Sequence, residues 1–473
     1  MKILRNYFYS ALYQIFVLLV PLITIPYISR VLGPHGIGIN TLTSSVTQYF
    51  VLFANLGLTM YGQREVAYYR QNRAKLSQTF WDIETLSILT TIFSLGMFYI
   101  FLNINGQYRE YYLAQTFLIL ASAADVSWVF MGLENFKVTV LRNFIFKIIS
   151  IFFIFTFVNN KEDLLKYILI ISVSSFLGNL SLWPYLKKYL DKFSLQDLGL
   201  VQHLKPAIAL FIPQIAINIY AVLNKIMLGK MISVEASGFF DSSDKIVRMV
   251  LTILTALTTV MMPHVANAYM NGQKEKVDFY LKKSFNISLF IAIPMMFGLN
   301  AIAADFVPLF FGKQFLPVIR VISIEAIAII PIACAGVLGV QYLIPLKRTR
   351  QYTRSIFIGA GMNVLINIPL IHYFSASGAA VATVISETCV TLAQLYFVNK
   401  DLQISGLFQD SVKISISGFI MFVIIKLFSF YFSVSITLLV IEVIVGVLVY
   451  LISAYILRVK MFDMIQNFIT RNK

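Results

Sequence analysis

Residues 21–38 read Pro-Leu-Ile-Thr-Ile-Pro-Tyr-Ile-Ser-Arg-Val-Leu-Gly-Pro-His-Gly-Ile-Gly. This stretch ends one long apolar run at Arg30 and turns through Gly33, Pro34 and Gly36 into a second apolar run. Each run has at least the roughly 20 residues that a helix needs to cross the hydrocarbon core of a bilayer. The stretch therefore predicts two membrane helices joined by a tight turn.

Apolar runs of this length continue along the whole chain of 473 residues. The mean hydropathy is +0.78, and 13% of the residues are charged, against about 25% in a soluble domain. We therefore expect an all-α polytopic membrane protein with about 14 transmembrane helices. The short loops leave no room for a soluble catalytic domain. The expected spans are 8–32, 38–62, 80–103, 111–133, 143–159, 165–186, 206–231, 238–265, 284–311, 316–343, 355–374, 377–399, 411–432 and 434–457.

The order of features around residues 21–38 returns in the second half of the chain. Ile212-Pro213 is followed by Ile226-Met-Leu-Gly229, a turn with Gly238 and another apolar run. A duplication of six spans predicts two lobes in the same orientation, and parallel repeats place a substrate site between them near the midplane. We expect an N-lobe (1–200, spans 1–6 and a linker), a C-lobe (201–400, spans 7–12), and spans 13 and 14 with a cytoplasmic tail (401–473). The polar stretch 187–205 is expected to be a solvated linker.

The basic residues indicate how the chain is oriented in the membrane. Most of the 38 lysines and arginines fall on alternate loops, which is the positive-inside pattern. It predicts cytoplasmic termini and places Lys137, Arg142 and Lys147 in a cytoplasmic loop. The net charge of +16 then needs no nucleic-acid partner. The turns expected outside lie near Gly36, Gly106, Ser233 and Ser375.

Four cations lie inside or at the end of apolar spans: Arg30, Lys225, Lys245 and Arg248. A lysine or arginine at bilayer depth costs roughly 2.5–3.5 kcal/mol even on the lenient insertion scale. Such residues are therefore paired, or they line a water-filled path. For Arg30 and Lys225, anchoring or snorkelling at the outer interface is the alternative to a role in a cavity.

The eighth span begins Gly238-Phe-Phe-Asp-Ser-Ser-Asp-Lys-Ile-Val-Arg248. Asp241 and Lys245 are four residues apart, as are Asp244 and Arg248, so each pair can form an ion pair on the helix surface. Two readings stay open. The pairs neutralise a polar helix end, or their cations together with Lys225 bind a phosphate or diphosphate group.

Polar groups in other spans allow further roles. Asp125 is either an ion-coupling carboxylate or a partner of a lobe cation. We expect Lys426 and Glu442, in the last two spans, to form a structural pair. The cysteines and histidines show no metal-ligand spacing, so no metal or cofactor is expected.

With these residues the chain resembles the Wzx-type oligosaccharide flippases, a branch of the MOP (multidrug/oligosaccharidyl-lipid/polysaccharide) exporter superfamily. The resemblance covers essentially the whole chain. One position departs from it, because members of that family often carry Asp where this chain has Asn224, directly before Lys225. The motifs that carry the resemblance are Ile28-Ser-Arg-Val-Leu-Gly-Pro-His-Gly-Ile-Gly38, Lys225-Ile-Met-Leu-Gly229, Asp244-Lys245-Ile and Gly378-Ala-Ala380.

The resemblance implies a multi-pass protein of the bacterial plasma membrane that moves an undecaprenyl-diphosphate-linked oligosaccharide repeat unit from the inner to the outer leaflet. It implies alternating access of two lobes around a cationic cavity, and service to capsule, exopolysaccharide or O-antigen synthesis alongside a polymerase and glycosyltransferases. The alternatives are a MATE-like drug or metabolite exporter and a non-transporting scaffold of a polysaccharide synthase complex. The cavity residues expected are Arg30, Lys225, Lys245 and Arg248, with Asp125, Asp241, Asp244 and Asn224 in supporting or coupling roles.

Overall fold

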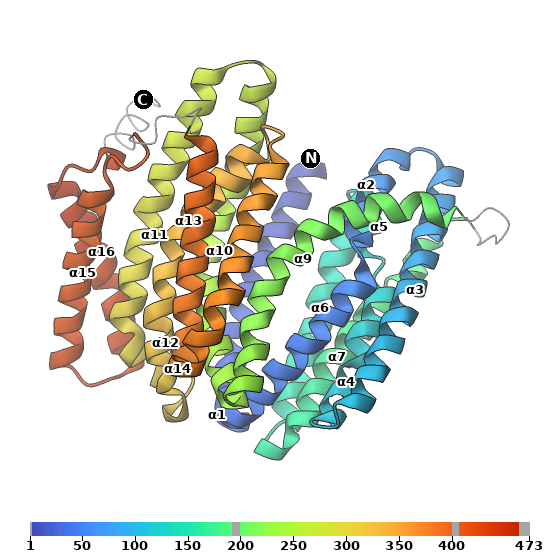
Figure 1. The fold of residues 1–473 in the computed structure, drawn as a ribbon, viewed down its shortest axis with the longest axis horizontal. Coiled ribbons are helices and arrows are strands. Elements are labelled where there is room, and N and C mark those ends of the chain that lie inside the picture. The colour runs from blue at the N-terminus through green and yellow to red at the C-terminus, as the bar shows by residue number, and fades with distance from the viewer. Residues whose placement is uncertain (1, 192–198, 400–405, 463–473) are drawn as a thin grey trace. The chain divides into compact units, whose positions relative to one another are not determined.

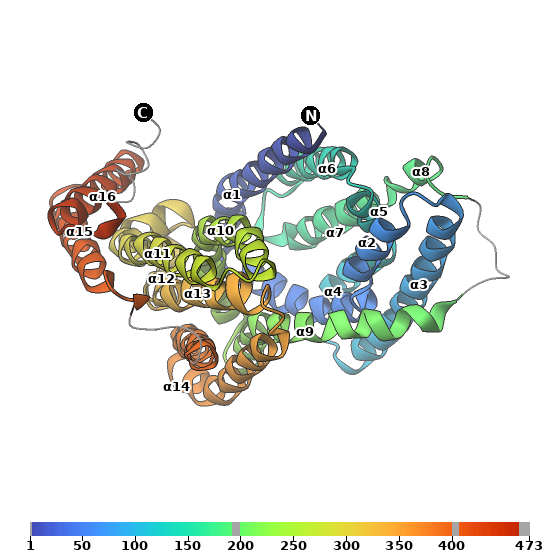
Figure 2. The same ribbon diagram turned by 90° about the horizontal axis from the view of Figure 1, so that it is seen from above.

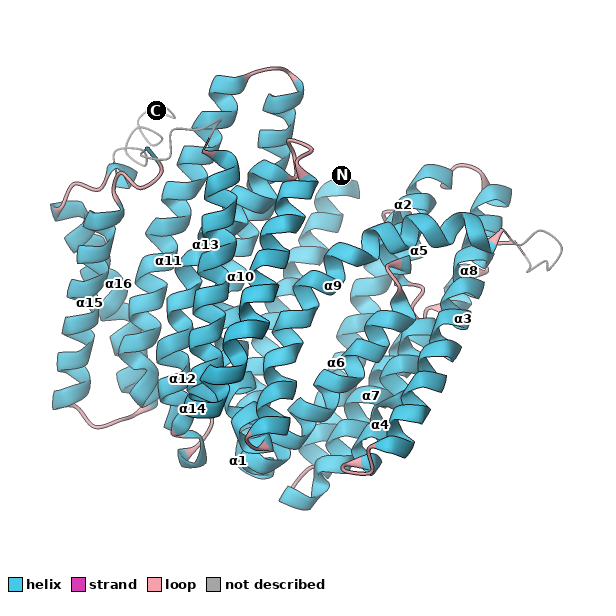
Figure 3. Cartoon of the chain, in the orientation of Figure 1, coloured by secondary structure: helices cyan, strands magenta, loops and turns pink. Residues whose placement is uncertain are grey.

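Helices make up all the regular secondary structure that the described residues form (Figures 1 and 3). The structure is a computed structural model that describes residues 2–191, 199–399 and 406–462. For residues 2–15, 17, 18, 212–214, 216, 217 and 219–221 it describes the backbone alone. The chain divides into two compact units, 1–229 and 230–473. The boundary between lobes expected at residue 200 stays a prediction.

Unit 1 is built from helices that pack around small apolar cores, two of which lie among the described residues. One core gathers around Phe80, Trp128 and Val66, and the other around Phe98 and Tyr112. The elements in chain order are α1 (Lys2–Asn55), α2 (Leu58–Tyr69), α3 (Arg73–Ile104), α4 (Arg109–Ala123), α5 (Ser127–Gly132), α6 (Phe136–Phe157), η1 (Lys161–Asp163), α7 (Leu164–Leu180), α8 (Trp183–Leu186) and α9 (Leu200–Met231).

The element α1 consists of two helices that meet at Gly33. Gly33 has φ 68° and ψ −179°, a conformation that a residue without Cβ adopts at little cost. The following Pro34 lacks the N–H that would continue the hydrogen-bond ladder. The break lies between the first two expected spans, as the sequence predicts.

Buried polar side chains hold α1 against α4. The Thr47 hydroxyl donates to Gln115 Oε1 at 2.7 Å, and Gln115 Nε2 donates to the Thr43 hydroxyl at 2.9 Å. In a bilayer, lipid tails are as apolar as leucine, so hydrogen bonds of this kind contribute to the choice of helix partners.

Unit 2 holds the remaining helices around a larger apolar core, which includes Phe285, Leu338 and Tyr342. Its elements are α10 (Val234–Met270), α11 (Lys274–Phe310), η2 (Lys313–Phe315), α12 (Pro317–Glu325), η3 (Ala326–Ala328), α13 (Ile329–Ala335), the π-helix η4 (Gly336–Leu343), α14 (Thr349–Val398), α15 (Ser411–Tyr431) and α16 (Ile436–Ile456).

The element α14 is also two helices, and they meet at Ser375, where φ is 54° and ψ is −135°. The break separates the two spans expected at 355–374 and 377–399. Close packing at this break requires Gly378, because a Cβ there would collide with the carbonyl group of Leu370. The chain bend thus explains why the Gly378-Ala-Ala380 motif begins with glycine.

The last two helices pack on α11 (Figure 2). The Tyr450 hydroxyl on α16 donates to the carbonyl oxygen of Phe290 at 2.7 Å. The expected pair of Lys426 with Glu442 is found only as an electrostatic interaction at longer range, without a direct ion pair. Glu442 is fully buried, and its direct partner is the Ser429 hydroxyl, which donates to it at 2.7 Å.

By length and composition, ten described segments are suited to cross a membrane. All the expected spans fall on helical segments, and α1 and α14 each carry two of them. The chain is therefore an all-α polytopic membrane protein, as predicted. One detail is corrected: α6 begins at Phe136, so Lys137, Arg142 and Lys147 all lie inside a helix rather than in a loop.

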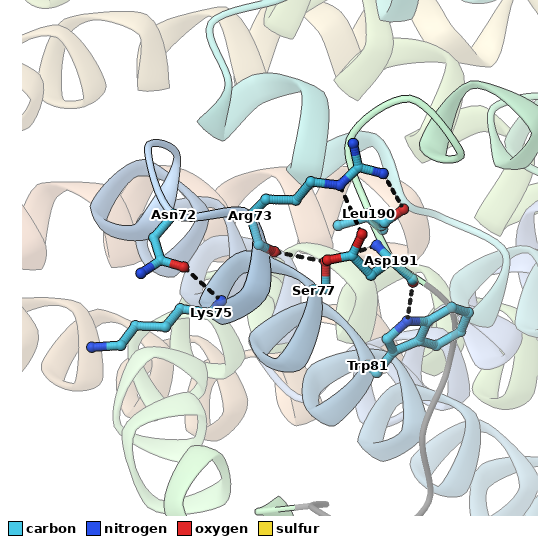
Figure 4. A network of polar contacts seen from close by, with 7 residues as sticks. All are labelled: Asn72, Arg73, Lys75, Ser77, Trp81, Leu190 and Asp191. Carbon is cyan, nitrogen blue, oxygen red and sulfur yellow. Dashed lines mark hydrogen bonds and ion pairs between the residues drawn. The ribbon is translucent and has the colours of Figure 1, made fainter.

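The beginning of the expected linker is tied to α3 (Figure 4). Arg73 donates from Nε to Asp191 Oδ1 at 2.8 Å and from a terminal nitrogen to the Leu190 carbonyl at 3.0 Å. The backbone N–H of Asp191 donates to the Ser77 hydroxyl at 2.8 Å, and Trp81 Nε1 donates to the Asp191 carbonyl at 3.1 Å. Leu190 and Asp191 are thus anchored to α3. Residues 192–198 lie outside the described part of the chain.

Candidate functional site

The charged face of α10 carries both ion pairs that the sequence predicts. Lys245 Nζ lies 2.6 Å from Asp241 Oδ2, and Arg248 Nε lies 2.6 Å from Asp244 Oδ1. The pairs form within one helix because residues four apart lie one turn above each other.

The acids and bases of these pairs differ sharply in exposure. The side chains of Asp241 and Asp244 are 7% and 8% exposed, whereas those of Lys245 and Arg248 are 47% and 56% exposed. The carboxylates thus contact the cations from the buried side of α10, and the cationic groups stay accessible. An anion can therefore reach both cations without entering the helix packing.

The exposed face of α10 continues towards its C-terminal end with hydroxyl groups. Thr252, Thr255 and Thr259 follow Arg248 at spacings of a helical face, and the last two are exposed. Each hydroxyl donates to a backbone carbonyl of its own helix, at 2.8–3.0 Å. Their oxygens remain able to accept hydrogen bonds. A face with two cations and three hydroxyls is poorly suited to lipid tails.

The opposite face of α10 is fixed to α12. The Ser243 hydroxyl donates to Glu325 Oε2 at 2.5 Å, and both residues are buried. This contact, which the sequence did not predict, sets the rotation of α10 about its axis. It thereby helps to decide that Lys245 and Arg248 are on the accessible side.

Arg30 lies on the exposed side of α1, three residues before the break at Gly33. One of its terminal nitrogens donates to the Pro26 carbonyl oxygen at 3.3 Å. The side chain therefore runs back along its own helix, and its head group stays accessible to solvent.

Asn224 and Lys225 lie on α9, whose residues up to Gly229 belong to unit 1. Asn224 is 2% exposed and Lys225 is half-buried. A Cβ at Gly229 would lie 2.8 Å from a Leu42 methyl group, so the end of this motif packs tightly against the second half of α1.

Asp125 lies in the break between α4 and α5, where its Oδ1 accepts a hydrogen bond from the Ser127 N–H at 3.0 Å. The side chain thus shapes the turn at the start of α5. This contact tests neither of the two roles expected for Asp125. Its action as an ion-coupling carboxylate or as a partner of a lobe cation stays a hypothesis.

The expected site residues fall on both units. Asp241, Asp244, Lys245 and Arg248 come together on α10 in unit 2, while Arg30, Asp125, Asn224 and Lys225 belong to unit 1. A single cavity formed by both sets stays a prediction.

A polar site that the sequence did not reveal lies at the start of α9. His203, Tyr61 and Asp82 are buried and in line, with His203 Nδ1 2.8 Å from the Tyr61 hydroxyl oxygen and Nε2 3.3 Å from Asp82 Oδ2. The three residues come from α9, α2 and α3, and no local spacing pattern in the sequence connects them.

This helical fold is shared by solved multi-pass membrane transporters. The lipid II flippase MurJ in an inward closed conformation shares it, with a TM-score of 0.79 at 16% identity over 97% of this chain and 100% of that one. An inward-facing MATE multidrug transporter of the MOP superfamily has a TM-score of 0.64 at 13% identity over 83% of this chain and 96% of that one.

The chain belongs to the polysaccharide biosynthesis protein family, whose model matches residues 3–269. It is also 22% identical to a putative O-antigen transporter of Escherichia coli K12 over 402 residues, which cover 84% of this chain and 97% of that protein. The expected membership of the Wzx-type branch of the MOP superfamily is thereby confirmed.

Proposed function

We propose that this protein is a flippase that moves an undecaprenyl-diphosphate-linked oligosaccharide from the cytoplasmic to the outer leaflet of a bacterial plasma membrane. The observation that carries the proposal is the α10 face, where Lys245 and Arg248 are about half exposed while Asp241 and Asp244 hold them from the buried side. Arginine offers a fork of donors to phosphate oxygens, and lysine offers a mobile charge.

The hydroxyl groups that follow the cations support the same substrate class. Thr255 and Thr259 are exposed along the face that begins with Lys245 and Arg248. A diphosphate at the cations would place its attached sugars beside a helix face whose oxygens accept hydrogen bonds from sugar hydroxyls. Family membership and the similarity to an O-antigen transporter point in the same direction.

Transport would proceed by alternating access, in which the two lobes rock around the bound diphosphate. A ligand shifts such an equilibrium only through its different affinity for the two states. We expect the substrate affinity of the two states to differ because different numbers of lobe cations, Arg30 among them, reach the phosphates in each state.

The proposal is tested by deleting the gene and isolating lipid-linked sugars from the inner leaflet. A single oligosaccharide on a diphosphate lipid should accumulate, and the wild-type gene should clear it. A drug or metabolite exporter would instead leave these lipids unchanged and alter drug resistance. A scaffold would stop synthesis before the repeat unit is complete. Either of these outcomes would overturn the flippase assignment.

A further inference from the structure

Unit 1 contains a polar cavity of about 330 Å³ that is separate from the α10 face. Helices α6 and α7 form two of its walls, and α1 and α4 contribute Thr24, Val20 and Leu118. These helices are neighbours in the fold (Figure 2). The cavity therefore lies wholly within unit 1.

The helix α6 has two faces of opposite character. One presents exposed apolar side chains, among them Ile145, Ile148 and Phe152, as expected of a helix in contact with lipid. The other presents Arg142 and Lys147 to the cavity, together with the polar residues Asn143 and Ser150. Because both faces belong to one candidate membrane span, the polar face places two positive charges at membrane depth.

Lys147 stands in the middle of this span. It is eleven residues from the start of α6, a distance of about 16 Å at 1.5 Å per residue. A lysine side chain is too short to carry its ammonium group from there to either end of the helix. Within the described part of the chain the ammonium group of Lys147 has no hydrogen-bond or ion-pair partner, and no carboxylate is among the residues that line the cavity.

Arg142 is held in place by its neighbours. One of its terminal nitrogens donates to Asn179 Oδ1 at 2.5 Å, and Asn179 Nδ2 donates in turn to the Ala121 carbonyl at 2.7 Å. On the same wall Gly178 allows α7 to approach α6 closely, since a Cβ there would lie 3.3 Å from the Phe146 ring. A cation fixed in this way keeps its position when a ligand arrives or leaves.

The facing wall of α7 supplies further donors. Ser174 and Ser175 line the cavity, and their hydroxyls make no hydrogen bond to any described residue. Two cations, two serine hydroxyls and the Asn143 amide thus converge on one space. This set of donors, without a carboxylate, is suited to the oxygens of a phosphate group.

We propose that this cavity binds the phosphate ester of a membrane lipid, with Lys147 and Arg142 as its counter-charges. The apolar side chains that also line the cavity, among them Phe146, Ile151 and Ile171, would contact the aliphatic chains of the same lipid. The site differs in position and in residues from the α10 face, and it does not rest on the proposed function. Phospholipids and polyprenyl phosphates share the required chemistry.

The test uses the full chain in non-ionic detergent and native mass spectrometry of bound lipid. The probes are dioctanoyl phosphatidylglycerol, farnesyl phosphate, dioctanoylglycerol (which has no phosphate) and inorganic phosphate. Lys147→Gln should weaken binding of at least one phosphate ester about tenfold, because a charge-assisted hydrogen bond is lost. Lys147→Arg should restore it. Tighter binding of dioctanoyl phosphatidylglycerol would identify a phospholipid as the ligand, and tighter binding of farnesyl phosphate would identify a polyprenyl phosphate.

The matched control is Lys137→Gln, which removes an exposed lysine of the same helix outside the cavity and should leave binding unchanged. To separate this site from the α10 face, the measurement is repeated with Asp241→Asn and Lys245→Gln, where the effect of Lys147→Gln should persist. Equal binding by Lys147→Gln and the wild type overturns the site. Displacement of the lipid by millimolar inorganic phosphate, or equal binding of dioctanoylglycerol, overturns the assignment to a lipid phosphate.

Discussion

The phenolic oxygen of Tyr61 lies 2.8 Å from Nδ1 of His203 and joins α2 to the start of α9. The other ring nitrogen of His203 lies 3.3 Å from Asp82 Oδ2 on α3. A carboxylate accepts hydrogen bonds, so Nε2 of His203 is the donor to Asp82, and Nδ1 shares the second hydrogen bond with the Tyr61 hydroxyl. Asp82 Oδ1 also accepts from the Gly199 N–H at 3.0 Å, so this carboxylate holds the chain on both sides of α9's first residue.

We expect His203→Ala to lower the free energy of unfolding by about 2–3 kcal/mol, because Tyr61 and Asp82 would lose a buried partner. Tyr61→Phe removes one hydrogen bond and should cost about 1 kcal/mol. Thermal unfolding of the purified protein measures both. Tyr68→Phe, on a side chain that is 70% exposed, is the matched control and should have no effect. Equal stability of His203→Ala and the wild type would show that this contact does not stabilise unit 1.

We expect Lys245→Ala and Arg248→Ala each to abolish polymer export while the protein still accumulates in the membrane. Each single change also leaves a buried carboxylate without its partner, so folding must be separated from binding. The neutral pairs Asp241→Asn with Lys245→Gln and Asp244→Asn with Arg248→Gln remove the charge without stranding an acid. Export should stay lost in both. Recovered export in the two neutral pairs would make the charges structural and end the diphosphate hypothesis.

We expect the turns after the first, third, seventh and eleventh spans to lie outside. The structure shows which positions test this best, since Gly36 is buried and the Ser233 hydroxyl caps α10 by accepting a hydrogen bond from the Ala236 N–H. The exposed residues His35, Gly106, Ile232 and Phe374 are better sites for single cysteines, with Cys334 and Cys389 replaced by alanine. An impermeant maleimide should label all four in intact cells. Labelling only after lysis would invert the topology.

We expect lipid-linked substrate to shorten the distance between the cytoplasmic ends of the two lobes, because the diphosphate neutralises cations that otherwise repel each other. Spin labels at Gln71 and Lys274, both exposed, measure this distance. Arg70 is unsuitable because it pairs with Glu134 at 2.8 Å. An unchanged distance distribution at saturating substrate, in protein shown to be active, would rule out rocking of the lobes.

Local patterns in the sequence were sufficient to predict the spans, the break at Gly33 and the two ion pairs of α10. Hydropathy identifies spans because the bilayer demands about 20 apolar residues from each. The break at Gly33 follows from glycine and proline chemistry within three residues. The pairs of Asp241 with Lys245 and of Asp244 with Arg248 form within one helical turn, so no other part of the chain has to be known.

Only the tertiary structure shows which face of each helix is buried and which is exposed. In water an apolar stripe marks the buried side of a helix, but in a membrane both lipid and protein neighbours are apolar. The sequence therefore could not tell that Asp241 is buried while Lys245 is exposed, that Ser429 is the direct partner of Glu442, or that Lys147 faces a cavity. Contacts such as Tyr61 with His203 join residues 142 positions apart, and only the packing of whole helices brings them together.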